Sequence, residues 1–93
     1  MAVGVCRVQL LIGTSNSLKS KRQVLKGLMG KIRSRFNVAV AELEDQDKWQ
    51  KAVLGIVTVS NDGRFVNEVL SKAVGFIEQS YLAEVLDYSI EIY

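Results

Sequence analysis

The sequence predicts a single α+β domain whose elements follow the order strand, helix, strand, strand, helix, strand. Two patterns predict it: apolar residues alternate in four segments and recur at helical spacing in two others. The chain has 93 residues, of which 48% are hydrophobic, enough for one hydrophobic core and too few for a second. No Pro, low-complexity stretch or linker marks a domain boundary. We therefore expect residues 1–93 to form one domain.

The first half of the chain predicts a strand, a helix and a second strand. Val3–Ile12 is rich in β-branched residues and alternates, which predicts a strand with one well-buried face. A short polar break follows, and Asn16 or Ser17 can cap a helix that runs to about Arg35. Phe36–Glu44 alternates again and is predicted to be the second strand, which ends in a polar turn.

The second half predicts a strand, a helix and a last strand. Ala52–Ser60 should pair antiparallel with the preceding strand because the connection between them is short. Asn61–Gly63 ends this strand and can cap a helix from about Arg64 to Gln79. The residues of this helix at core spacing are Val66, Leu70, Ala73, Val74 and Ile77. Glu84–Tyr93 alternates and is predicted to be the fourth strand.

This order of elements allows few packings. Right-handed crossovers and one apolar sheet face favour a four-stranded antiparallel sheet with both helices on the same side. The sequence therefore predicts a ferredoxin-like β-α-β-β-α-β sandwich.

The distribution of charge is the main functional indication. Eight of the twelve Lys and Arg residues, and none of the ten acidic residues, precede Glu42. The net charge of +2 therefore hides a strongly basic first part and an acidic second part. Seven of the eight early positive residues lie in the first predicted helix: Lys19, Lys21, Arg22, Lys26, Lys31, Arg33 and Arg35. A concentrated positive surface attracts polyanions.

A helical wheel arranges these residues in two rows beside an apolar stripe centred on Leu25. The first row consists of Lys19, Arg22, Lys26 and Arg33. The second row, on the opposite edge, consists of Lys21, Lys31 and Arg35. Between the rows lie small or polar residues that include Gly27 and Gly30, each of which costs about 1 kcal/mol relative to Ala in a helix. No acidic residue is available within this helix to pair with the positive charges.

Three interpretations of this helix remain open. A polyanion backbone can lie across the small residues, held by Lys and Arg from both rows. Another protein can pack closely on the strip of Gly and Ser residues. The third interpretation is a solvated face whose positive charges attract Glu42, Glu44 and other acids of the same fold.

The predicted fold leaves one sheet face without helices. Alternation assigns to it Val5, Arg7, Gln9 and Leu11 from the first strand and Ala52, Leu54, Ile56 and Thr58 from the third. None of these residues is aromatic, which argues against RNA bases stacking on the sheet. Val5, Leu11, Leu54 and Ile56 instead predict an apolar protein interface, such as that of a homodimer. Scattered apolar residues on a monomer are the open alternative.

The sequence carries no recognisable catalytic or metal-binding pattern. It has no His and a single Cys, so neither a thiol–imidazole pair nor a zinc cluster is available. The acids of the 44–47 turn lack the spacing of a calcium loop. We predict no metal and no cofactor, and an enzyme is the least supported class. No segment predicts a membrane span or a signal peptide, so the cytoplasm is the expected location.

Several stretches together resemble the YlxP-like family of small bacterial proteins, also described as a bacterial domain of unknown function 503. They are residues 17–22 (SLKSKR), 35–42 (RFNVAVAE), 45–50 (DQDKWQ), 60–62 (SND) and 86–88 (LDY). Family members often carry an acid after Ser-Leu-Lys, whereas this chain has Ser20. The resemblance implies a ferredoxin-like fold and supplies no catalytic residues. Family members are often encoded beside translation initiation and ribosome maturation factors, which implies a link to RNA or the ribosome by association.

Two functional hypotheses follow from the residues and the resemblance. The first is a non-enzymatic RNA- or ribosome-associated factor that contacts phosphates through the first row, with the second row in support. The second is a protein-interaction module, either a homodimer through the open sheet face or a protein docked on the strip at Gly27 and Gly30.

Overall fold

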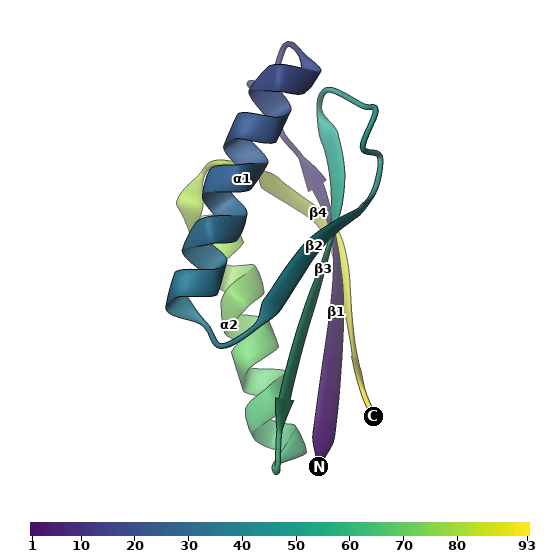
Figure 1. The fold of residues 1–93 in the computed structure, drawn as a ribbon, viewed down its shortest axis with the longest axis vertical. Coiled ribbons are helices and arrows are strands. Elements are labelled where there is room, and N and C mark those ends of the chain that lie inside the picture. Colours follow the sequence, from purple (N-terminus) through teal and green to yellow (C-terminus); the bar gives the residue numbers. More distant parts are fainter.

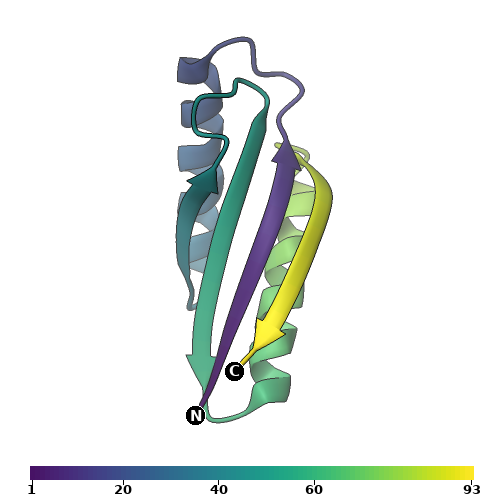
Figure 2. The same cartoon turned by 90° about the vertical axis from the view of Figure 1, so that its right-hand side faces the viewer.

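The computed structural model describes all 93 residues and has the predicted order of elements. The elements are β1 (Ala2–Leu11), α1 (Leu18–Arg35), β2 (Ala39–Glu44), β3 (Lys51–Ser60), α2 (Gly63–Ser80) and β4 (Glu84–Ile92). The four strands form one antiparallel sheet in the order β2-β3-β1-β4. Both helices cover the same face of this sheet (Figure 1), and Figure 2 looks onto the face that they leave open. The ferredoxin-like prediction is confirmed.

Short polar side chains begin both helices. The Ser17 hydroxyl caps α1 by accepting a hydrogen bond from the Ser20 N–H at 3.0 Å. The Asp62 carboxylate caps α2 by accepting from the Arg64 N–H at 2.9 Å. The second strand begins at Ala39 and not at Phe36, because the Phe36 N–H still donates to the Ile32 carbonyl and closes the last turn of α1.

The core lies between the helices and the sheet. It contains Cys6, Val8 and Leu10 from β1 and all five residues predicted for α2. Gly4 lets α2 approach β1 closely, since a Cβ at that position would lie 2.2 Å from Cγ1 of Val66. Burial in this core raises the pKa of the Cys6 thiol to about 11, so Cys6 is a protonated core residue at neutral pH.

The two faces of β3 are opposite to the prediction. β3 pairs with β1 so that Leu54 faces Val8 and Ile56 faces Cys6, and both β3 side chains are fully buried in the core. The expectation that Leu54 and Ile56 line the open sheet face is therefore wrong. Alternation could not show which set of β3 side chains faces the helices, because β3 is a central strand with apolar residues on both faces.

The open sheet face has a different apolar composition. Val5 and Leu11 lie on it as predicted, each half-buried, and their β3 partners are Val57 and Lys51. Val57 and Val59 are 38% and 55% exposed there. The Leu43 side chain covers Gly55, where a Cβ would meet it at 2.9 Å. Arg7 forms an ion pair with Glu44 across this face.

Candidate nucleic-acid interface

Six of the seven predicted positive residues are exposed along α1. These are the first row (Lys19, Arg22, Lys26 and Arg33) and two members of the second row (Lys31 and Arg35). The chain has four ion pairs within 4.0 Å, and none of them includes any of these six side chains. Their charges are therefore uncompensated by close carboxylates.

Part of the first row borders a groove between α1 and the edge strand β2. Arg22, Lys26 and Arg33 line a hollow of about 300 Å³. Leu25 and Met29 form its apolar wall, and Glu42 of β2 also lines it. Three positive side chains therefore converge on one hollow together with a single carboxylate.

The second row borders a separate hollow between α1 and α2. Lys31 and Arg35 line this hollow of about 440 Å³ together with Ser34, Phe76 and Ser80. The Arg35 guanidinium carbon lies over the Phe76 ring, 5.0 Å from its centroid. The helix thus presents positive charge on both of its exposed edges, as the two rows predict.

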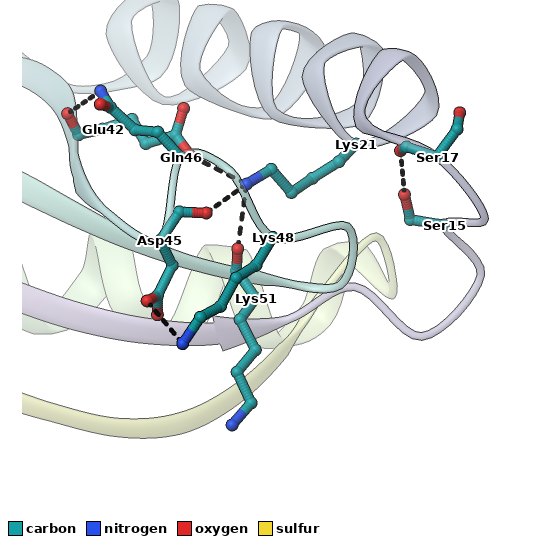
Figure 3. A network of polar contacts seen from close by, with 8 residues as sticks. All are labelled: Ser15, Ser17, Lys21, Glu42, Asp45, Gln46, Lys48 and Lys51. Atoms are coloured by element: carbon teal, nitrogen blue, oxygen red, sulfur yellow. Dashed lines mark hydrogen bonds and ion pairs between the residues drawn. The ribbon is translucent and has the colours of Figure 1, made fainter.

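Lys21 departs from the predicted set because its side chain is fully buried. Its Nζ donates hydrogen bonds to the carbonyls of Asp45 at 2.7 Å and Lys51 at 3.1 Å, and lies 3.3 Å from Oε2 of Glu42 (Figure 3). Lys21 therefore holds α1 to the β2–β3 connection and is not available to an external polyanion. The spacing in the sequence indicates this burial, because Lys21 precedes Leu25 by four positions and Leu28 by seven and so lies on the core stripe.

The backbone of the β2–β3 connection directs a carbonyl oxygen toward Lys21. Asp45 has a left-handed backbone conformation (φ 63°), and its carbonyl accepts from both Lys21 Nζ and the Lys48 N–H. The Lys48 ammonium lies 3.2 Å from Oδ1 of the same Asp45. Gln50 extends the contact by donating from Nε2 to the Ser15 carbonyl at 3.2 Å. The stretches 17–22 and 45–50 thus meet in space, a contact that their separation in the sequence does not indicate.

Two acids proposed to neutralise the helix surface have other partners. Glu42 pairs with the buried Lys21, and Glu44 pairs with Arg7 on the open sheet face. The exposed strip between the rows is free of neighbours, since a Cβ at Gly27 or Gly30 would meet nothing within 4 Å. Neither Glu42 nor Glu44 forms an ion pair with the exposed rows.

No group of three or more His, Cys, Asp or Glu side chains is arranged to hold a metal ion. Neither helix combines the length and the apolar character that a membrane crossing requires.

Two solved structures are similar in fold. A putative chlorite dismutase (TA0507) matches all of this chain with a TM-score of 0.61 and 14% identity. This chain spans 44% of that longer protein. The de novo designed protein Foldit4 matches all of this chain with a TM-score of 0.54 and 12% identity, over 97% of its own length. At such identities the likeness concerns the fold alone.

Sequence comparison gives a nearer relationship. The chain is 33% identical over 76 residues to the uncharacterized protein YlxP of Bacillus subtilis (strain 168), covering 82% of this chain and 83% of that protein. Residues 3–90 match the family described as "Protein of unknown function (DUF503)". Both matches agree with the resemblance carried by the sequence motifs, and the chain belongs to this DUF503 family.

Proposed function

We propose that this protein is a non-enzymatic factor that associates with RNA or the ribosome and contacts phosphates through α1. One observation carries the proposal: six exposed positive side chains share one helix and have no carboxylate partner within 4.0 Å. Repulsion among them disfavours the isolated protein, and a polyanion relieves it by replacing condensed counterions. The two helix-interior glycines keep the strip between the rows open to such a backbone.

The first row supplies the principal contacts in this proposal. Arg22, Lys26 and Arg33 converge on the groove beside β2, and Lys19 continues the row toward the start of α1. Lys31 and Arg35 contact the same polyanion from the other edge of the helix. Contacts of this kind fix the position of a nucleic acid without selecting its sequence.

Co-sedimentation with ribosomal subunits and with naked ribosomal RNA across a salt series tests the proposal. Binding should weaken steeply as salt rises. Charge reversal of Lys26→Glu with Arg33→Glu should lower affinity and reduce the slope of log K against log salt by about 1.5, the loss of two phosphate contacts. Lys51→Glu with Arg64→Glu is the matched control, because it makes the same change in net charge at exposed positions outside α1.

Two results would remove α1 from this proposal. One is a Lys26→Glu, Arg33→Glu variant with unchanged affinity and slope. The other is an equal loss in the control pair, which would show that net charge alone governs binding. Absence of binding by the unaltered protein even at low salt would reject the RNA proposal itself.

A second candidate function is homodimerisation through the open sheet face. It is favoured by the exposed Val57 and Val59, which lie next to Val5 and Val3 on a face that no helix covers. Such an association should persist at high salt because it buries apolar surface. The mass in solution at high salt should correspond to a dimer, and a Val57→Asp, Val59→Asp variant should be a folded monomer. A monomeric unaltered protein at high concentration would rule this candidate out.

A further inference from the structure

The hollow between α1 and α2 differs chemically from the groove beside β2. It combines two positive side chains, Lys31 and Arg35, with two serine hydroxyls and the ring of Phe76. The groove beside β2 has positive side chains and aliphatic walls but no aromatic ring. At about 440 Å³, the hollow is in the size range of small-ligand sites.

The Phe76 ring contacts the Arg35 side chain, and the Phe36 ring in turn packs against Phe76. The guanidinium of Arg35 lies over the Phe76 ring, and the Phe36 ring packs against Phe76 edge-on, with centroids 6.1 Å apart and an interplanar angle of 74°. Arg35 is exposed and has no acid partner. The ring therefore occupies one side of a planar cation whose other side and N–H groups remain available to a ligand.

The other polar groups of the hollow complement a phosphate and a base edge. Lys31 lies one helical turn before Arg35 on the same edge of α1 and supplies a second positive charge. The Ser34 hydroxyl donates to the Lys31 carbonyl at 3.0 Å, so its oxygen can still accept a hydrogen bond. Anionic phosphate, a flat ring and a donor group are the features of a nucleotide.

A second hollow adjoins the first at the same stacked pair. It has a volume of about 370 Å³, shares Arg35 and Phe76 with the first, and is otherwise lined by residues that include Lys72 and Gln79 of α2. A single strand of RNA in one hollow can therefore continue past Arg35 and Phe76 into the other hollow. A duplex keeps its bases stacked inside, whereas a single strand can offer a base to such a pair.

We infer that the hollow between α1 and α2 binds one unpaired nucleotide of single-stranded RNA. The base stacks on the Arg35 guanidinium, and the adjacent phosphate pairs with Lys31. This inference rests on the proposed RNA association and adds a base contact to it. The first row alone predicts no preference between unpaired and base-paired RNA, whereas this site favours unpaired bases.

Fluorescence anisotropy with a short single-stranded oligoribonucleotide and an abasic strand of the same length tests this site. Arg35→Lys keeps the charge but removes the planar group, so it should weaken binding of the base-containing strand about tenfold, the loss of one stacking contact. The same variant should bind the abasic strand as the unaltered protein does. Arg64→Lys, the same substitution at an exposed position outside both hollows, is the control and should change neither affinity.

The outcomes separate this inference from the function on which it rests. If RNA binding depends on salt but Arg35→Lys does not weaken it, the nucleotide site is wrong. The proposed phosphate contacts would then still account for the binding. Equal weakening on both strands would also overturn the nucleotide site, because the loss would then not involve the base. If the unaltered protein binds neither strand at low salt, the proposed function and this inference fall together.

Discussion

The Nζ atom of Lys21 and Oε2 of Glu42 lie 3.3 Å apart and join α1 to the edge strand β2 from inside the molecule (Figure 3). Lys21 is fully buried, and the Glu42 side chain is 20% exposed. The Lys21 ammonium donates hydrogen bonds to the carbonyls of Asp45 and Lys51, whereas the Glu42 carboxylate contributes an ion pair and no hydrogen bond. One of the seven positive residues of α1, Lys21, therefore attaches this helix to the sheet.

Replacement of Lys21 should affect stability and leave RNA binding nearly unchanged. Lys21→Met keeps most of the aliphatic length but leaves two carbonyls and the Glu42 carboxylate without their buried partner, so we expect a loss of about 3 kcal/mol in the free energy of unfolding. Urea denaturation measures this loss. Lys19→Met, at an exposed position two residues earlier, is the control and should cost less than about 0.5 kcal/mol. If Lys21→Met is as stable as the control, the contacts of Lys21 with Glu42, Asp45 and Lys51 do not stabilise the fold.

The sequence predicted the fold because its local signals agree with one another. Ser17 and Asp62 cap the two helices, and the five apolar residues predicted at core spacing in α2 are all buried. The face assignment of β3 failed for a physical reason. Val57 and Val59 are as apolar as the buried Leu54 and Ile56, so only the pairing with β1 decides which set enters the core.

The candidate site was predictable in composition and less so in detail. Its exposed rows follow from helical spacing, and only Lys21 lies elsewhere, because it occupies a core position where a lysine is rarely found fully buried. One partner of Lys21 is the carbonyl of Asp45, which has a left-handed conformation in the β2–β3 connection, and the other two, Glu42 and Lys51, lie on the strands that this connection joins. The position of Phe76 beneath Arg35 depends on how the two helices pack, which the pattern of either helix alone does not specify.

Glycine substitutions should have opposite effects at two positions. Gly4→Ala would place a Cβ 2.2 Å from Val66 and 2.7 Å from Leu70, both fully buried, so we expect a loss of stability of about 2 kcal/mol or more. Gly30→Ala meets nothing within 4 Å and should stabilise α1 by about 1 kcal/mol. Thermal unfolding of both variants measures the difference. A destabilised Gly30→Ala protein would show that the strip is not open in the native state.

The buried thiol of Cys6 should make stability fall at alkaline pH. Burial raises its pKa from 9.0 to about 11, so between these values the unfolded chain has lost a proton that the native chain retains. The unfolded state then binds fewer protons, and stability decreases as pH rises, by at most about 3 kcal/mol in total. Urea denaturation from pH about 8 to about 11 should show a steeper decline in the native protein than in Cys6→Ala. Parallel declines would contradict the burial of this thiol.

Glu42 should oppose RNA binding while it supports the fold. Its carboxylate pairs with Lys21 and also lines the groove bordered by Arg22, Lys26 and Arg33. A negative charge there repels phosphate, so Glu42→Gln should raise affinity for RNA about fivefold at low salt, which corresponds to about 1 kcal/mol. The same variant should lose about 1 to 2 kcal/mol of stability, because Lys21 keeps only a neutral partner. RNA-binding titrations and urea denaturation measure the two effects.

The matched control for this prediction is Glu44→Gln. Glu44 carries the same charge, but its ion pair with Arg7 lies on the open sheet face, away from the groove. Removal of its charge should leave affinity nearly unchanged and cost less than about 1 kcal/mol, as expected for an exposed ion pair. Equal gains in the two variants would indicate an effect of net charge alone. Weaker RNA binding by Glu42→Gln would place the phosphate contacts outside the groove beside β2.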